Sequence, residues 1–199
     1  MLSGPEIAAQ VKAGNIVISN FDPTKVGPNS YDLTLDKRLL VYEKAYSTHL
    51  WSQNFRWWNP FTWFPPRCAP LDPKVKERVV ELEISETGTT LYPGVLYLGS
   101  TVERTSSRGF IPWIEGRSSM GRLGLGVHIT AGLGDDGVDL QWTLELTCVH
   151  PILIFPGMKI CQICFVRTDG ESKPYDGKYQ GSTGVVASRY HMDPFCPKE

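Results

Sequence analysis

Residues 114–125 combine two arginines, two adjacent serines and three glycines in the run I-E-G-R-S-S-M-G-R-L-G-L. Glycines let backbone N–H groups approach a ligand closely, and each arginine guanidinium can bind two phosphate oxygens at once. The run therefore predicts binding of a small anionic ligand that carries phosphates. Taken alone, it is also compatible with an ordinary glycine-rich turn that holds two solvated arginines.

A glutamate on a predicted strand is the second candidate for chemistry. Residues 141–149 alternate, so that one face carries Thr143, Glu145 and Thr147 and the other carries apolar side chains. A partly buried carboxylate holds a proton more readily than one in water and can act as a proton shuttle. Glu145 is therefore a candidate general base, with a solvent-facing strand glutamate as the alternative. Residues 123–130 also alternate, which predicts a half-buried strand leading out of the arginine–serine run.

Length and charge limit the classes of function. The 199 residues fit one domain, with 41% hydrophobic and 21% charged residues and a net charge of −1. This balance gives no overall field that would attract a nucleic-acid polymer, so an anionic partner must be met locally. The sequence has neither an apolar run of the ~20 residues that span a bilayer nor a signal-peptide layout. We expect a cytoplasmic protein without a membrane partner.

Five cysteines show no disulfide-framework spacing. Cys161 and Cys164 form a C-x-x-C pair within a predicted strand, where residues three apart point to opposite faces. Two thiols placed in this way do not easily bind one metal ion, so we expect them to be structural.

The rest of the chain predicts a mainly β protein with a short N-terminal helix. Ser3, Pro5 and Glu6 form a helix start of the S-x-x-E type, and Gly14 a stop. Alternating apolar residues from Tyr31 onward, and Pro-Gly pairs at 93–94 and 156–157, then indicate short strands joined by type II turns. We expect a compact barrel or jelly roll.

Residues 44–75 interrupt this pattern with a cluster of aromatic side chains and prolines. The cluster is too irregular for a strand and too apolar for a flexible linker. Three interpretations stay open: an excursion packed on its own side chains, a contact between subunits, or a platform on which bases stack.

Several motifs in order resemble the dCTP deaminases of the dUTPase superfamily. They are G-R-S-S-M-G-R-L-G-L at 116–125, V-H-I-T-A at 127–131, Asp135 and T-L-E-L at 143–146. Further matches at 2–7, 28–33, 98–103, 156–160, 178–181 and 187–189 extend the similarity over nearly the whole chain, the 44–75 excursion excepted. The resemblance implies one dUTPase-like domain over 1–199, a distorted β-barrel. It also implies a homotrimer with active sites between subunits and a C-terminal lid at about 170–199.

The resemblance implies catalytic roles for four residues. Glu145 matches the glutamate that activates a water to attack C4 of cytosine and passes the proton to the departing amine. Ser118 and Arg122 match residues that orient the water and polarise the site. The main-chain carbonyl of Ala131 matches one that helps to hold the water or amino group.

Substrate-binding roles are implied in the same way. Arg117 and Ser119 would contact the triphosphate, and Asp135 would accept a hydrogen bond from the 3′-hydroxyl. Main-chain groups of Thr143 and Leu144 would read the pyrimidine edge. The lid would contribute Tyr175, Lys178 and Ser182, the last at a position where glutamine is common in the family.

The implied reaction converts dCTP to dUTP and ammonia. The chain lacks the paired H-x-E and P-C-x-x-C motifs of the zinc deaminases, so we expect no zinc and no protein-bound metal. Mg²⁺ is expected only on the nucleotide triphosphate. Feedback inhibition by dTTP is a family trait and is also expected.

Departures from the family pattern keep two other functions open. Leu133 stands where many members carry arginine, and members with an apolar residue there include enzymes that also hydrolyse dUTP to dUMP and pyrophosphate. A dUTPase-like nucleotide-binding protein without deaminase activity is the third option. Asp136 and Asp139 replace uncharged residues, which predicts altered handling of water or metal near the phosphates. His128 is expected to be structural, and Val138 leaves acceptance of a 5-substituted cytosine open.

Overall fold

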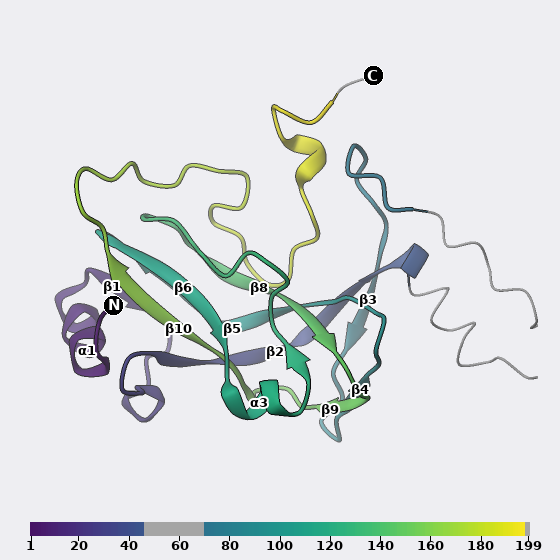
Figure 1. Ribbon diagram of the computed structural model, residues 1–199, viewed down its shortest axis with the longest axis horizontal. Coiled ribbons are helices and arrows are strands. Elements are labelled where there is room, and N and C mark those ends of the chain that lie inside the picture. The colour runs from purple at the N-terminus through teal and green to yellow at the C-terminus, as the bar shows by residue number, and fades with distance from the viewer. Residues whose placement is uncertain (46–69, 198–199) are drawn as a thin grey trace, which may run out of the picture.

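The computed structural model describes residues 1–45 and 70–197 (Figure 1). The helices are α1 (Gly4–Ala13), η1 (Pro23–Lys25), α3 (Ser118–Arg122) and η3 (Tyr190–Met192). The strands are β1 (Ile16–Ile18), β2 (Tyr31–Tyr42), β3 (Val79–Glu83), β4 (Thr89–Leu91), β5 (Tyr97–Ser107), β6 (Phe110–Gly116), β7 (Leu125–Gly126), β8 (Asp139–Cys148), β9 (Ile152–Ile154) and β10 (Lys159–Arg167). The aromatic side chains predicted to form an excursion at 44–75 lie outside the described residues.

Helix α1 begins and ends where the sequence predicts. The Ser3 hydroxyl accepts a hydrogen bond from the Glu6 N–H at 3.4 Å, and Gly14 closes the helix with a left-handed φ of 78°. The reciprocal half of the capping box is replaced, because the Glu6 carboxylate accepts hydrogen bonds from Gln10 and Arg167 instead. Ile7, on the buried side of the helix, packs into the core.

The strands pair in antiparallel fashion in the order β6-β10-β2-β5-β8-β7, with β1 on β5 and β3 on β2. Strands β4 and β9 form a separate pair. The free edge of β6 is also covered: Ile114 N–H donates to Gly132 O at 2.7 Å, and Gly134 N–H donates to Pro112 O at 2.8 Å. Residues 132–134 thus join β6 to the connection between β7 and β8, which curls the sheet into a distorted barrel.

The core lies inside this curved sheet. Tyr31, Leu33 and Leu35 are fully buried along β2, as their alternation predicts. Gly94 and Gly157 adopt φ values of 80° and 73°, which supply the positive φ that a type II turn needs at its third position. The prediction of a mainly β chain with one N-terminal helix is confirmed.

Cys161 and Cys164 both lie on β10, and both are buried. Burial raises the pKa of both thiols, which keeps them protonated and poorly suited to bind metal. Within the described ranges, no group of three or more His, Cys, Asp or Glu side chains is arranged to hold a metal ion. The burial agrees with a structural role.

The predicted strand at 123–130 is wrong. Ser118–Arg122 forms a short helix, and only Leu125–Gly126 pairs as a strand, β7. Gly124 has a left-handed φ of 83° that breaks the extended chain before β7. After β7 the N–H of Ile129 bonds to the side chain of Glu145 rather than to a neighbouring strand.

No helix between residues 1 and 45 or 70 and 197 has the length and apolar character needed to cross a bilayer.

Candidate active site

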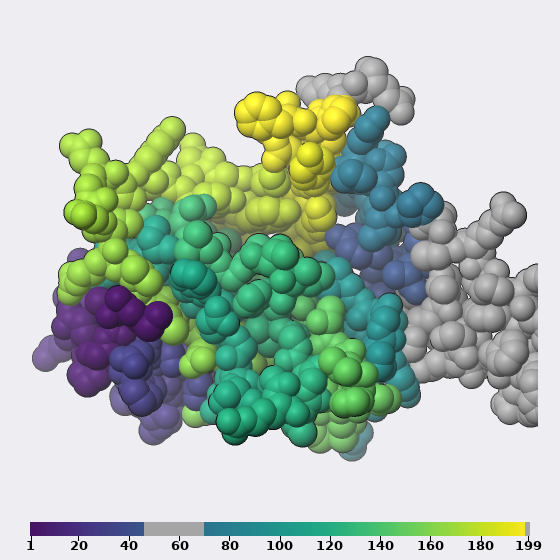
Figure 2. All heavy atoms as spheres, viewed as in Figure 1, coloured from purple at the N-terminus to yellow at the C-terminus, as the bar shows by residue number. Residues whose placement is uncertain are grey.

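A pocket of about 510 Å³ lies between the outer face of β8 and the C-terminal segment 174–188. Figure 2 shows the C-terminal residues as a yellow-green to yellow band along the top of the view. The pocket gathers six of the residues predicted from the sequence to take part in catalysis or substrate binding: Ala131, Asp135, Thr143, Glu145, Tyr175 and Ser182.

Glu145 projects from the middle of β8, opposite Leu98 of β5. Its side chain is half-buried, and Oε2 accepts a hydrogen bond from the Ile129 N–H at 2.7 Å. The Glu145 N–H in turn donates to Val127 O at 2.9 Å. A carboxylate anchored through one oxygen keeps lone pairs on the other for a water molecule or a substrate proton. The Glu145 carboxylate is thus fixed in position, with one oxygen left available to a ligand in the pocket.

The second wall of the pocket is the C-terminal segment, which hydrogen-bonds along β8. Gly181 N–H donates to Asp139 O at 2.9 Å, and Gln141 N–H donates to Ser182 O at 3.0 Å. Further along, Val186 N–H donates to the Thr143 hydroxyl at 3.1 Å. These bonds hold the segment predicted to be a lid against the barrel in this structure.

Tyr175 and Lys178, the two other predicted lid residues, differ in position. Tyr175 lines the pocket, and its N–H donates to Asp136 O at 2.7 Å. Lys178 does not line the pocket, because its ammonium group pairs with the Asp193 carboxylate at 2.7 Å. The hydrogen bond between them raises the pKa of Lys178 and lowers that of Asp193. The cation predicted to bind phosphate is therefore held by an acidic residue of the same chain.

The arginine–serine group lies apart from the pocket. In Figure 1, α3 lies at the bottom of the view and the C-terminal segment at the top. None of residues 117–122 contributes to the pocket lining. Ser118, Ser119 and Arg122 are exposed, whereas Arg117 Nε pairs with Asp32 at 3.2 Å. Within one protomer, the structure does not bring these residues to Glu145.

Leu144, predicted to read a pyrimidine through its main chain, turns its side chain into the core. Only its backbone can take part in the site. Strand β8 thus presents Thr143 and Glu145 to the pocket and uses the residue between them for packing, as the alternation predicts.

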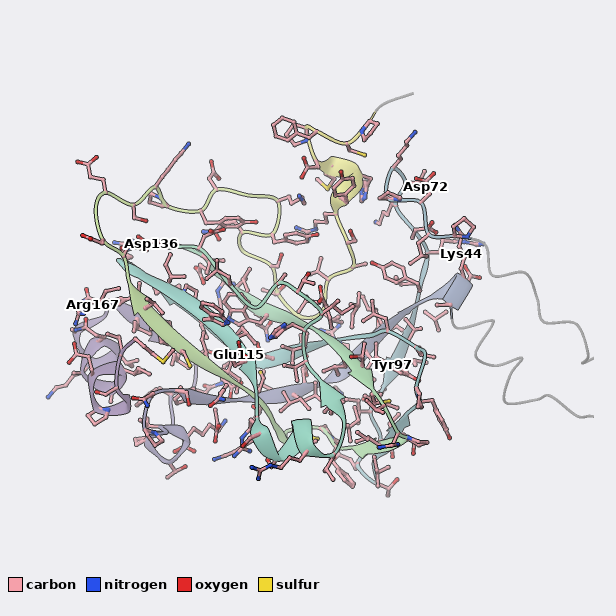
Figure 3. The ribbon with its side chains drawn as sticks, in the orientation of Figure 1. Lys44, Asp72, Tyr97, Glu115, Asp136 and Arg167 are labelled. Atoms are coloured by element: carbon pink, nitrogen blue, oxygen red, sulfur yellow. The ribbon has the colours of Figure 1, made fainter. Side chains whose placement is uncertain are left out.

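The two additional carboxylates, Asp136 and Asp139, both contact other parts of the fold. Asp136 is buried, and its Oδ1 accepts a hydrogen bond from the Gly109 N–H at 2.8 Å, beneath the C-terminal segment (Figure 3). Asp139 pairs with Arg104 at 2.7 Å. Both are therefore occupied in holding β5, β6 and β8 together.

His128 lies beside the site without lining the pocket. Its Nε2 is 3.7 Å from the Glu115 carboxylate, which also accepts a hydrogen bond from the Trp113 indole N–H at 2.9 Å (Figure 3). The space above the ring is closed, because a Cβ at Gly132 would lie 3.1 Å from Nε2. The ring is thus enclosed, and its buried Nδ1 has no hydrogen-bond partner among the described residues.

The sequence interpretation missed the apolar end of the pocket. Tyr42, Leu96 and Leu98 of the β2–β5 region line it, and the Tyr42 hydroxyl accepts a hydrogen bond from the Ser188 N–H at 3.0 Å. Apolar residues at 39–42 and 95–98 signal strands in the sequence. Which of their faces meets the C-terminal segment depends on a contact between residues far apart in the chain.

Comparison with known proteins identifies the family. The family model described as dCTP deaminase-like matches residues 1–168. A protein of Clostridium beijerinckii named "dCTP deaminase, dUMP-forming" is 41% identical over 194 residues, which are 97% of this chain and 98% of that protein. A Rhodopirellula baltica protein named "dCTP deaminase" is 40% identical over 97% of this chain and 85% of its own length.

A solved structure supports the fold. The 2′-deoxycytidine 5′-triphosphate deaminase from Agrobacterium tumefaciens superposes with a TM-score of 0.58 over 82% of this chain, at 19% identity. The present chain spans 46% of the length of that chain. The predicted distorted β-barrel is confirmed. On the family model and the relatives together, the chain belongs to the dCTP deaminase-like family.

Proposed function

We propose that this protein is an enzyme that deaminates dCTP hydrolytically without zinc. The observation that carries the proposal is the Glu145 carboxylate, anchored by Ile129 N–H on the wall of a pocket of nucleoside size. Glu145 takes a proton from water, and the oxygen of that water bonds to C4 of cytosine. As the oxygen bonds to C4, the double bond between C4 and N3 opens and N3 takes up the proton held by Glu145. Glu145 then carries the remaining hydroxyl proton to the amino group, so that the C4–N bond breaks, ammonia leaves and a uracil carbonyl forms at C4.

The other pocket residues supply the positioning in this proposal. The Ala131 carbonyl holds the water or the departing amine, and main-chain groups of Thr143 and Leu144 contact the pyrimidine edge. Asp135 accepts a hydrogen bond from the 3′-hydroxyl. The apolar wall that includes Val138 and Leu140 excludes water from the ring.

A homotrimer would complete the site. The proposed reaction needs a cation to stabilise the negative charge that develops on the oxygen at C4. Arg122, the predicted cation, lies outside the pocket of its own protomer. In the proposed trimer, α3 of a neighbouring subunit brings Ser118 and Arg122 to C4, and Arg117 and Ser119 to the phosphates. Three exposed apolar side chains near α3 and the pocket support such a contact: Leu123, Ile129 and Leu133.

We further propose that the reaction continues to dUMP and pyrophosphate. The relatives named dUMP-forming match 97% of this chain. Leu133 lines the pocket, at the position where the family resemblance implies arginine in many members. Release of dUTP after deamination is the second candidate, supported by the relative named simply dCTP deaminase.

The metal of this proposal is Mg²⁺ bound through the triphosphate. Two carboxylates line the pocket, Asp135 and Glu145, and Glu145 is already engaged with Ile129. Oxygens of the nucleotide and water would therefore supply most of the ligands of the ion. Cytoplasmic location and inhibition by dTTP complete the proposal.

Chromatography of the nucleotides after incubation with dCTP and Mg²⁺ tests both steps. We expect dUMP and pyrophosphate to rise together while dUTP stays at trace level. Accumulation of dUTP would limit the activity to deamination. If dCTP is unchanged while added dUTP is hydrolysed, the protein is a dUTPase and the deamination proposal is wrong. Parallel incubation with 5-methyl-dCTP shows whether Val138 leaves room for a substituent.

A further inference from the structure

The pocket continues past Glu145 into an end lined by apolar side chains, which the proposed reaction of dCTP does not use. Tyr42, Leu96 and Leu98 line this end. Leu98 pairs with Glu145 in the register of β5 and β8, and Leu96 lies two residues closer to the start of β5. Tyr42 reaches the same level, because it follows Leu40 by two residues and Leu40 pairs with Leu98. Two residues of a strand span about 6.8 Å, so the lining extends by roughly that length beyond the level of Glu145.

The proposed contacts give the direction in which a bound cytosine points. Asp135, proposed to meet the sugar, lies in the connection just before β8, and Glu145 follows Thr143 by two residues within the strand. In a pyrimidine nucleoside, C4 and its amino group lie across the ring from N1, which carries the sugar. A cytosine with its sugar near Asp135 and its C4 near Glu145 therefore points its amino group toward the apolar end.

The two flanks of the site offer that amino group different surroundings. Strand β8 lies between β5 and β7 in the sheet. The chain that continues from β7 supplies the Ile129 N–H, which bonds to Glu145, and Ala131, whose carbonyl is proposed to hold the amine. On the β5 flank lies Leu98, whose side chain is nearly buried and has no hydrogen-bonding group. Of the two hydrogens on N4, one can donate to the Ala131 carbonyl, whereas the other faces hydrocarbon.

We propose that the enzyme also releases alkylamines from dCTP that carries an alkyl group on N4, with N4-methyl-dCTP as the smallest such substrate. The inference rests on the proposed function and widens its substrate class. The remaining hydrogen of N4 is donated to the Ala131 carbonyl, and the methyl group replaces the second hydrogen against Leu98 and Leu96. Burial of one methyl group against an apolar wall favours binding by about 4-fold.

The reaction of N4-methyl-dCTP follows the same steps and balances. The water oxygen bonds to C4, the double bond between C4 and N3 opens, and N3 takes up the proton held by Glu145. The remaining hydroxyl proton passes through Glu145 to N4, and the C4–N4 bond breaks with its electron pair on nitrogen. N4-methyl-dCTP and water thus give dUTP and methylamine, and the nucleotide product is the same as from dCTP.

Incubation of the full-length protein with dCTP, N4-methyl-dCTP or N4,N4-dimethyl-dCTP, each with Mg²⁺, tests the proposal. Chromatography identifies the amine and the uracil nucleotide that are released. We expect equal amounts of methylamine and uracil nucleotide from N4-methyl-dCTP. For the dimethyl nucleotide, kcat/KM should be about 3- to 10-fold lower than for the monomethyl one, because its N4 has no hydrogen to donate to the Ala131 carbonyl.

Substitutions of Leu96 test where the alkyl group lies. L96F fills the apolar end, so the ratio of kcat/KM for N4-methyl-dCTP to that for dCTP should fall by about 10-fold. L96A enlarges the same end and should raise the corresponding ratio for N4-ethyl-dCTP. The matched control is L153F, which adds the same ring on β9, outside the pocket lining, and should keep the parent ratio. Because each readout is a ratio of two substrates, a general loss of active protein does not imitate the result.

The outcomes separate this inference from the proposed function. Release of ammonia from dCTP without methylamine from N4-methyl-dCTP would overturn the inference and leave the proposed function standing. An unchanged ratio in L96F, or equal rates for the monomethyl and dimethyl nucleotides, would also overturn it. If dCTP itself releases no ammonia, the deamination proposal fails and this inference fails with it.

Discussion

The pocket beside β8 and the exposed helix α3 differ in the chemistry of their side chains. The pocket is mostly apolar, contains Glu145 and is lined by no cationic side chain of the described residues. Helix α3 and its flanking residue Arg117 carry the cationic groups and hydroxyls that suit phosphates, on the surface. The proposed substrate would need both environments, and these lie apart within one protomer. In the proposed trimer, assembly rather than folding alone would bring Glu145 and the cationic groups of α3 together.

Removal of the Glu145 carboxylate should have the largest effect. Glu145→Gln keeps the shape but cannot accept the proton from water, so kcat for deamination should fall by about 10²–10⁴-fold. Binding of uncharged deoxycytidine should change little, because glutamine keeps the size of the side chain and the rest of the pocket lining is unchanged. Steady-state ammonia release measures the first quantity and calorimetry the second. A variant that retained the parent rate would remove Glu145 from the mechanism.

Arg122→Ala tests whether the two halves meet across subunits. Loss of the positive charge should lower kcat by about 10²–10³-fold, the range for removal of one oxyanion-stabilising group. We expect activity to reappear when Arg122→Ala and Glu145→Gln proteins are mixed and allowed to exchange subunits. Some sites would then combine an intact Glu145 with an intact α3 from its neighbour.

A control must show that any recovered activity comes from mixed sites and not from residual activity of either variant. The control is each variant mixed with itself under the same conditions, which should stay inactive. Exchange is verified by mass spectrometry of differently tagged subunits. Confirmed exchange without recovered activity would show that Glu145 and Arg122 act within one protomer or in unrelated sites.

Arg117→Ala should have an intermediate effect confined to the phosphate half. Arg117 stays beside Asp32 in the free protein, at 3.2 Å, and is proposed to contact the triphosphate of a nucleotide held by the neighbouring subunit. Charge-assisted hydrogen bonds are worth about 1.5–3 kcal/mol, so the dissociation constant for dCTP should rise by roughly 10- to 100-fold. Deoxycytidine affinity should be unchanged. Equal losses for both ligands would place Arg117 in nucleoside binding or in folding.

The two regions also differ in how far sequence predicts them. Strand β8 was predictable because its alternation directly reports which side chains face the core, Leu144 inward and Glu145 outward. The conformation of the chain after α3, residues 123–130, was not predictable in this way. Leu123 and Ile129 fit a strand pattern, yet both are exposed, because backbone N–H of Ile129 serves the Glu145 carboxylate. A tertiary hydrogen bond overrode local periodicity there.

The predicted site residues also differ in how far the sequence predicts their surroundings. Motif resemblance predicted Asp135, Thr143 and Ser182, and the pocket gathers all three. It gave no sign that Lys178 is held by Asp193, since that contact depends on the turn at η3. The free state of a binding residue is set by the local fold, which a motif does not encode.

The smallest predicted effect concerns this contact. The Asp193 carboxylate occupies the Lys178 ammonium group at 2.7 Å and so competes with a substrate phosphate for it. Asp193→Asn should weaken the competition. An ion pair near the surface contributes little, so we expect the KM for dCTP to fall by only roughly 1.5- to 5-fold with kcat unchanged.

The effect of Asp193→Asn on the KM for dCTP should depend on pH in a defined direction. The pKa of Asp193 is lowered by its hydrogen bond to Lys178, and the pKa of Lys178 is raised, so the pair stays intact across neutral pH. The difference in KM between Asp193→Asn and the parent should therefore be constant there. It should shrink only in acid, as pH falls through the lowered pKa and the parent's own carboxylate is protonated. Asp176→Asn, an exposed carboxylate of the same segment, serves as control, and an equal fall in its KM would mean that general charge, not the pair, sets the affinity.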